Sequence, residues 1–165
     1  MGRGRRASLM LSALLILSAA PAPARGGEGA RWHISYNEAA ARAADLRRPL
    51  LLEFTGSDWC DWCRSLKTEV FDTPEFAAWS EKTVVLVEVD FPRNRSLDAN
   101  LLAQNNKLAE RFANYLVDGY PTILLLDPTG TRVIGELGYL DGGPAVWTTA
   151  ADRLLATATS PKATP

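Results

Sequence analysis

Residues 50–63 read Leu-Leu-Leu-Glu-Phe-Thr-Gly-Ser-Asp-Trp-Cys-Asp-Trp-Cys. A short apolar run that contains one acid and ends at Gly-Ser is typical of a buried strand followed by a turn. Cys60 and Cys63 are the only cysteines in the 165-residue chain. They lie where a predicted helix, residues 61–70, begins, so they fall on one face of its first turn. The stretch therefore predicts two neighbouring thiols at the end of an interior strand.

Two cysteines at this spacing can act as a redox pair, as metal ligands or as a structural disulfide. His33 is the only histidine, so one chain cannot supply the four Cys and His ligands of a structural zinc site. A disulfide that closes so small a loop stabilises a fold by roughly 2 kcal/mol, near the low end for structural disulfides. The helix start favours the redox use, because unpaired backbone N–H groups and the helix dipole stabilise a thiolate there.

The same positions predict a different role for each thiol. Cys60, at the helix start, is the expected nucleophile, and Cys63 is expected to resolve the mixed disulfide that Cys60 forms. Glu53 is an acid within an apolar strand. Burial would raise its pKa and suit it to accept the proton of Cys63, whereas at a sheet edge it would face solvent. Asp58 and Asp61 flank the nucleophile, and their charges are expected to raise its pKa and favour a reductant.

The rest of the pattern predicts one α/β domain with a central mixed sheet of about four strands flanked by helices. Short apolar or β-branched runs predict strands at residues 50–55, 83–90, 122–126 and 131–137. Helices are expected at residues 36–48, 61–70, 97–116 and 144–158 and from Pro74 onward. The first two strands should be parallel, and Asp127-Pro128-Thr129-Gly130 is typical of a type I turn that joins the last two. This order, with Cys-x-x-Cys after the first long strand, is that of the thioredoxin fold.

Two segments resemble the thioredoxin superfamily, and the likeness extends over roughly residues 36–158. Residues 54–63 read FTGSDWCDWC and residues 117–122 read VDGYPT. In that family the proline of the second segment, here Pro121, follows a cis peptide bond and faces the disulfide. The Gly-Ser-Asp-Trp-Cys-x-Trp-Cys form is similar to that of exported bacterial thioredoxin-like proteins and of periplasmic disulfide reductase domains. Asp-Trp stands between the cysteines where ordinary thioredoxin has Gly-Pro, and Glu53 lies one residue farther from the nucleophile than the thioredoxin aspartate does.

The resemblance implies a substrate cleft beside the disulfide. Tyr120 would line this cleft and pair its backbone with an extended substrate strand, which is recognition by β-augmentation. Pro121 and Thr122 belong to the same wall. Trp59 and Trp62 are candidates for substrate contacts from the cysteine side, with simple packing as the alternative.

The N-terminus has the layout of a secretory signal peptide. Arg3, Arg5 and Arg6 precede an apolar run at residues 9–20, which is short of the roughly 20 residues needed to span a membrane. Ala22-Pro23-Ala24 has the A-x-A form of a cleavage site. We expect cleavage near Ala24, with Ser18-Ala19-Ala20 as a second site, and therefore an exported, periplasmic protein. The expected organisation is a signal peptide at residues 1–24, a flexible segment at 25–35, the thioredoxin-like domain at 36–158 and a disordered tail at 159–165.

Together these features predict a thiol–disulfide oxidoreductase that reduces protein disulfides. It would need disulfide-containing protein substrates and a membrane-bound or soluble thiol protein as electron donor, but no metal and no cofactor beyond the Cys60–Cys63 disulfide. The net charge of −1, without a basic cluster beyond the first six residues, argues against a nucleic-acid partner. Two alternatives remain open. One is a specialised thiol reductase for cytochrome c maturation, and the other is a non-catalytic thioredoxin-fold binding module with a passive disulfide.

Overall fold

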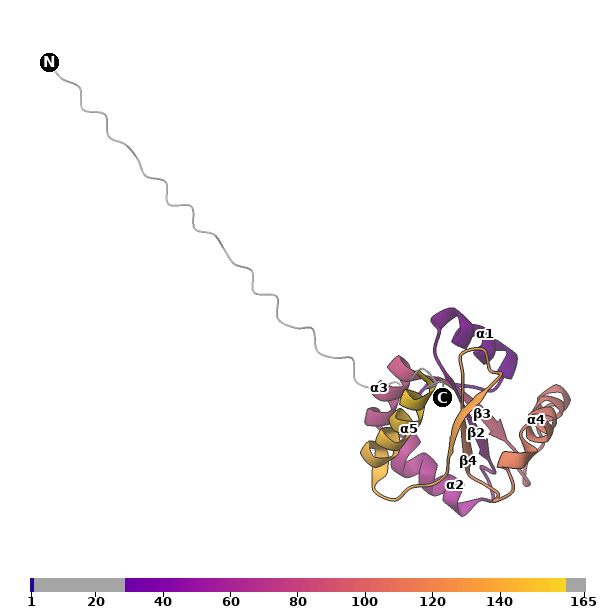
Figure 1. Cartoon of the computed structure of the whole chain (residues 1–165). Helices are drawn as coiled ribbons and strands as arrows, with labels where there is room; N and C mark the ends of the chain where they lie inside the picture. Colours follow the sequence, from indigo (N-terminus) through magenta and orange to yellow (C-terminus); the bar gives the residue numbers. More distant parts are fainter. Residues whose placement is uncertain (2–28, 160–165) are drawn as a thin grey trace, which may run out of the picture.

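A computed structural model describes Met1 and residues 29–159 (Figure 1). The predictions of a signal peptide and of a C-terminal tail concern segments 2–28 and 160–165, which lie outside the described residues. Within the described part of the chain, no helix combines the length and the apolar character that a membrane span requires.

The core of the domain is a mixed five-stranded sheet with the strand order β1-β3-β2-β4-β5. Its strands are β1 (Trp32–His33), β2 (Leu50–Thr55), β3 (Val85–Asp90), β4 (Thr122–Leu126) and β5 (Val133–Leu137). As predicted, β2 and β3 are parallel, while β4 runs antiparallel to both β2 and β5. The α/β thioredoxin fold expected from the sequence is confirmed, with one strand more than the four predicted.

Helices cover both faces of this sheet (Figure 1). One face packs against α1 (Tyr36–Leu46) and α4 (Ala99–Arg111), and the other against α2 (Asp61–Leu66), α3 (Pro74–Thr83) and α5 (Gly143–Thr159). Two short helical segments complete the chain: the π-helix η1 (Lys67–Phe71) and the 3₁₀-helix η2 (Ala113–Tyr115). The arrangement is a three-layer domain with a hydrophobic core on each side of the sheet.

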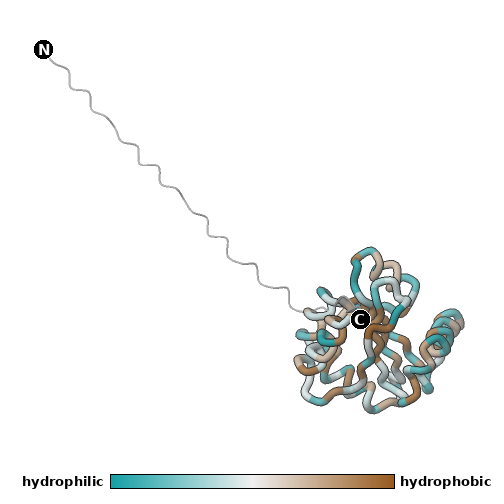
Figure 2. The backbone as a smooth tube through the Cα atoms, in the orientation of Figure 1, coloured by the Kyte–Doolittle hydropathy of each residue, from teal (hydrophilic) through white to brown (hydrophobic). Residues whose placement is uncertain are grey.

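Strand β2 is the central strand, and all six of its residues are buried. Leu50, Leu52 and Phe54 enter the core under α1 and α4, and Leu51 enters the core under α2, α3 and α5. Side chains alternate between the two faces of a strand, so Glu53 lies on the same face as Leu51. The hydrophobic segments accordingly converge on the middle of the domain (Figure 2).

Several predicted element boundaries are confirmed by their capping contacts. The Thr73 side chain accepts a hydrogen bond from the Phe76 N–H, and Pro74 occupies the first turn of α3. The Gly130 N–H donates to the Asp127 carbonyl over 2.8 Å, which closes the turn between β4 and β5. These are the contacts that the N-cap pattern and the Asp-Pro-Thr-Gly order predict.

The structure corrects the sequence prediction at three places. Residues 32–33, within the segment expected to be flexible, form the edge strand β1, which pairs with β3. The helix expected at 61–70 ends at Leu66 and continues as the π-helix η1. The helix expected at 97–116 ends at Arg111. A two-residue strand is too short for alternation to be visible, and a π-turn has no signature of its own in the sequence.

Candidate functional site

A disulfide joins Cys60 and Cys63 just beyond the carboxyl end of β2. Cys60 is the N-cap residue of α2, and its sulfur accepts a hydrogen bond from the Cys63 N–H over 3.2 Å. A backbone N–H aimed at this sulfur favours a negative charge on it once the disulfide is reduced. Cys60 is 7% exposed and Cys63 is 2% exposed. Cys60 is therefore the more accessible of the two, although both are buried.

The turn before β4 forms the opposite wall of the site. The Tyr120–Pro121 peptide bond is cis, as the resemblance implied. The Cys60 sulfur lies 3.6 Å from the Tyr120 carbonyl oxygen. Thr122 is buried, and its hydroxyl donates to the Gly119 carbonyl over 2.6 Å. Tyr120 and Pro121 therefore lie at the disulfide, whereas Thr122 stabilises the turn from beneath.

The loop after β3, residues 91–94, is fastened to the loop that carries Cys60. The Trp59 indole N–H donates to the Phe91 carbonyl over 2.8 Å, and the Arg93 guanidinium lies 3.8 Å from the centre of the Trp59 ring. The Asp58 carboxylate accepts backbone hydrogen bonds from Arg93 and Asn94. We call residues 91–94 the clamp loop. Nothing local in the sequence shows that the backbone of this loop binds a distant carboxylate.

The charges beside Cys60 are largely compensated. Hydrogen bonds from the backbone of the clamp loop, first of all from Arg93, hold the pKa of Asp58 below its ordinary value. Asp61 forms an ion pair with Arg64. Asp58 therefore has backbone donors next to its carboxylate, and Asp61 has a cation next to it. That these charges raise the pKa of Cys60 stays a prediction, and the partners of both aspartates reduce the size of the expected effect.

Trp62 lies on the outer side of the disulfide. It is 62% exposed, and its ring centre is 5.1 Å from that of Tyr139. The Tyr139 hydroxyl donates to Glu69 over 2.6 Å, and this bond raises the pKa of Tyr139 to about 12. Sequence analysis did not identify Tyr139, because it follows β5, far from the cysteines along the chain. Trp62 and Tyr139 together form an aromatic platform beside the site.

Glu53 lies beneath the site on the helix-α2 face of β2 and is 5% exposed. Burial raises its pKa from 4.5 to about 8, and the neighbouring carboxylate of Glu88 adds to this effect. A hydrogen bond with Thr55 and the positive charge of Lys67 oppose it. Glu53 therefore occupies the interior position predicted for it, where it keeps its proton near neutral pH.

The structure offers no metal centre at this site. Within residues 29–159, no group of three or more His, Cys, Asp or Glu side chains is arranged to hold a metal ion.

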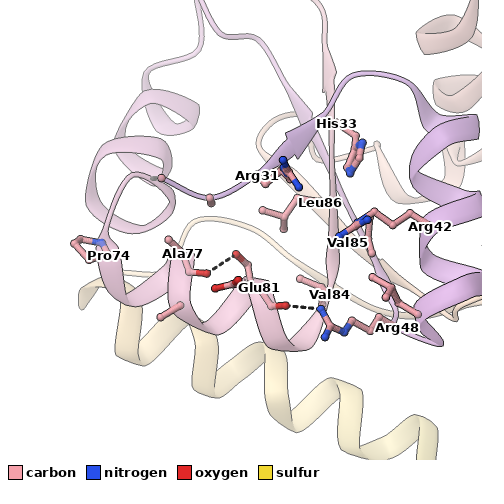
Figure 3. Close-up of a pocket in the computed structure, with 15 residues that line it drawn as sticks. Arg31, His33, Arg42, Arg48, Pro74, Ala77, Glu81, Val84, Val85 and Leu86 are labelled. Atoms are coloured by element: carbon pink, nitrogen blue, oxygen red, sulfur yellow. Dashed lines mark hydrogen bonds between the residues drawn. The ribbon is translucent and has the colours of Figure 1, made fainter. Parts of the chain in front are cut away.

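A cavity of about 920 Å³ lies away from the disulfide and is lined among others by Arg31, His33, Arg42 and Arg48 (Figure 3). It adjoins the start of β3, and β2 is parallel to β3. The cavity is thus at the opposite end of the sheet from the disulfide.

Comparison with known proteins identifies relatives that have the same fold. A family model described as Thioredoxin-like matches residues 31–128. The Disulfide bond reductase DsbH of Chlamydia pneumoniae is 32% identical over 113 residues, which are 68% of this chain and 66% of that protein. The Thioredoxin-related protein DsbJ of Chlamydia pneumoniae is 32% identical over 138 residues, which are 82% of this chain and 38% of that protein.

A solved structure described as DsbH Oxidoreductase has the same architecture. It is similar with a TM-score of 0.70 at 27% sequence identity, covering 91% of this chain and 95% of that one. The chain spans only 66% of the DsbH sequence and 38% of the DsbJ sequence.

Proposed function

The chain belongs to the thioredoxin-like family, and from this we propose that it is an exported thiol–disulfide oxidoreductase that reduces disulfides in other proteins. The observation that carries the proposal is the placement of Cys60. Its sulfur accepts the Cys63 N–H at the start of α2 and lies 3.6 Å from the Tyr120 carbonyl. One sulfur atom is thus both favoured as an anion and adjacent to backbone that can bind a substrate strand.

The reaction begins with the reduced protein. The Cys60 thiolate attacks one sulfur of a substrate disulfide, a mixed disulfide forms, and the other substrate sulfur leaves as a thiolate. Glu53 in its ionised form, which is the minor form near neutral pH because its pKa is about 8, then takes the proton of Cys63, and the Cys63 thiolate attacks the Cys60 sulfur. The second substrate thiolate leaves, and the Cys60–Cys63 disulfide closes. Two electrons have passed from the protein to its substrate.

Regeneration reverses these steps with a donor thiol. The donor thiolate attacks the Cys60 sulfur, and Cys63 leaves as a thiolate that takes the proton from Glu53. A second donor thiolate then attacks the donor sulfur of this mixed disulfide. Cys60 leaves as a thiolate, and the two donor sulfurs are joined in a disulfide. A carboxyl whose pKa is about 8 suits both directions, because its affinity for a proton is close to that of a thiol.

The reducing direction is supported by the relative whose printed name is Disulfide bond reductase DsbH. The aspartates beside Cys60 do not decide the direction, because both have compensating partners. The signal-peptide pattern supports export, which would place the protein where disulfides persist. An extracytoplasmic reductase needs a thiol protein as electron donor.

Two cysteine variants test this function. Cys60→Ser should abolish the reduction of insulin disulfides, because the attacking sulfur is lost. Cys63→Ser should accumulate mixed disulfides with substrate proteins, which gel electrophoresis without reductant would resolve. The double variant Cys60→Ser with Cys63→Ser is the control and should trap nothing. Insulin reduction by Cys60→Ser at the wild-type rate would refute the proposal.

The trapped partners also separate the alternatives. Partners with haem-attachment Cys-x-x-Cys-His motifs would favour the role in cytochrome c maturation. A reduction potential of the Cys60–Cys63 pair below about −300 mV would instead indicate a passive structural disulfide.

A further inference from the structure

Glu53 has a second carboxyl directly beside it. In the parallel pairing of β2 with β3, Glu53 is the register partner of Glu88. Register partners on adjacent strands point to the same face, and the strands are about 4.8 Å apart. The charge of Glu88 raises the pKa of Glu53, whereas the pKa of Glu88 is itself raised by its burial and by Asp90. The charge of Glu88 therefore acts on the proton that Glu53 holds.

The two carboxyls differ in their access to water. Glu53 is sealed at 5% exposure, while Glu88 is half-buried and lines a cavity of about 140 Å³ together with Asp90, Arg95 and Asn105. Strand β1 pairs with β3 only as far as Val87, so the edge of β3 beyond this point is uncovered and the cavity lies there. Ile34, Leu97 and Leu101 line the rest of the cavity, whose volume has room for water beside its polar groups.

The other charged groups near the pair have partners already. Asp90 accepts hydrogen bonds from the Ser57 N–H and hydroxyl and forms an ion pair with Arg95. Lys67, which acts on both glutamates from η1, is paired with Asp72. Among the described residues, no hydrogen bond or ion pair holds the Glu88 carboxyl. Glu88 is thus the one carboxyl that both adjoins Glu53 and is free to bind water.

We propose that Glu88 is the relay through which Glu53 exchanges its proton with solvent. The inference rests on the proposed function, in which Glu53 takes and returns the proton of Cys63. When Cys63 attacks, its proton moves to the Glu53 carboxylate, then to the Glu88 carboxylate, and then to water in the cavity. When the disulfide is reduced, a proton follows the reverse path to the Cys63 thiolate. No electrons move along this path, and each carboxyl ends as it began.

The relay matters because Glu53 has no direct contact with solvent through which to exchange its proton. Glu53 is covered by the sheet and by the helices that pack on it, and Cys63 in α2 is 2% exposed. Without a relay, Glu53 would exchange its proton only when the domain opens locally, which is slow compared with proton transfer through water. Glu88 is a positioning residue, because it acts on the thiol only through Glu53.

The test measures proton exchange at Glu53 directly, in the oxidised full-length protein labelled with [¹³C]glutamate. The side-chain carboxyl resonance of Glu53, assigned with Glu53→Gln, is followed by NMR across its titration. We expect one averaged resonance in the wild type. In Glu88→Gln we expect two separate resonances near the midpoint, because exchange slows at least tenfold. The control Glu136→Gln, an exposed glutamate on β5, should behave as the wild type.

One further variant and one added proton carrier separate a relay from a structural effect. Glu88→Asp keeps a carboxyl and should restore fast exchange, and a small proton carrier such as imidazole should do so in Glu88→Gln. Fast exchange in Glu88→Gln, or slow exchange that neither treatment restores, would overturn the relay. The exchange measurement uses no substrate, so its result is independent of the insulin assay. Failure of the wild-type protein to reduce insulin would count against the proposed function, whereas the exchange rate at Glu53 alone decides whether Glu88 is a relay.

Discussion

The guanidinium of Arg93 lies over the indole ring of Trp59, 3.8 Å from its centre. The two residues come from different loops, and the contact closes the clamp loop over the residue that precedes Cys60. The Trp59 ring also lies 5.9 Å from the ring of Tyr120, which in turn stacks on Phe91 at 5.8 Å. The shape of the wall around Cys60 therefore depends on the loop after β3.

Removal of the Arg93 side chain is expected to weaken this clamp modestly. An exposed cation–π contact contributes about 0.5–1 kcal/mol, and Arg93→Ala should lose this amount in urea denaturation. Arg93→Lys keeps the cation and should lose less. The backbone N–H that binds Asp58 remains in both variants, so a loss of several kcal/mol would contradict this account.

Gly56 is expected to tolerate no side chain. A Cβ at this position would lie 2.3 Å from the Trp59 ring, and that ring is fixed by Phe91 and Arg93. Gly56→Ala should destabilise the protein by about 1–3 kcal/mol, the range for overpacked sites. The matched control is Gly29→Ala, whose Cβ would meet no atom within 4 Å. Equal unfolding midpoints for the two variants would refute the steric argument.

Glu53 should make the protein less stable as the pH rises. Its folded pKa is about 8 against 4.5 for the unfolded value, so between these values the folded state holds a proton that the unfolded state releases. The free energy of unfolding should fall across this window, by on the order of 5 kcal/mol at most. Glu53→Gln should be as stable as the wild type near pH 4.5 and more stable at pH 8.5.

Urea denaturation of the oxidised proteins at these two pH values measures the difference. The control is Glu136→Gln, which should keep the wild-type decline. A wild-type decline in Glu53→Gln would show that another group is responsible.

Asp58 should have the opposite pH dependence. Its folded pKa is lowered, chiefly by the Arg93 N–H, so its stabilisation is present above the unfolded pKa and is lost as the pH falls through the folded pKa. Asp58→Asn should therefore be less stable than the wild type at pH 6, and the difference should shrink below about pH 4. Thermal unfolding at pH 3 and pH 6 measures this. A difference that does not change with pH would indicate a purely steric effect.

The aromatic platform is expected to serve binding more than stability. Trp62 is largely exposed and contacts Tyr139, and such pairs contribute about 0.5–1.5 kcal/mol. Trp62→Ala should raise KM for insulin reduction severalfold while kcat changes little. Tyr139→Phe keeps the ring and loses only the bond to Glu69, so its KM should stay near the wild-type value. An unchanged KM in Trp62→Ala would exclude a substrate contact.

The sequence predicted most of the fold and the centre of the site, because the signals there are local. Leu50 to Phe54 is apolar apart from Glu53, Thr73-Pro74 is a helix start, and Cys60 precedes a helical stretch. The interior position of Glu53 followed from its apolar neighbours. Each of these inferences needs only residues within one or two turns of each other.

The features that the sequence did not predict depend on contacts between distant segments. Asp58 binds backbone N–H groups of Arg93 and Asn94, and a backbone donor has no residue-type signature. Tyr139 reaches Trp62 only because the segment after β5 lies against α2 in the folded domain. Thr122 matched a family pattern, but whether its hydroxyl faces a substrate or a carbonyl depends on the turn geometry at Gly119.

The unequal burial of the two cysteines also bears on how the protein responds to peroxides. Peroxides convert accessible thiolates to sulfenic acid and then, irreversibly, to sulfinic and sulfonic acids. Cys63 lies behind Cys60 at 2% exposure, so damage should begin at Cys60. A sulfenic acid on Cys60 has the Cys63 thiol beside it, and condensation of the two restores the disulfide with loss of water. The same arrangement that serves catalysis would thus allow the protein to repair its own first oxidative lesion.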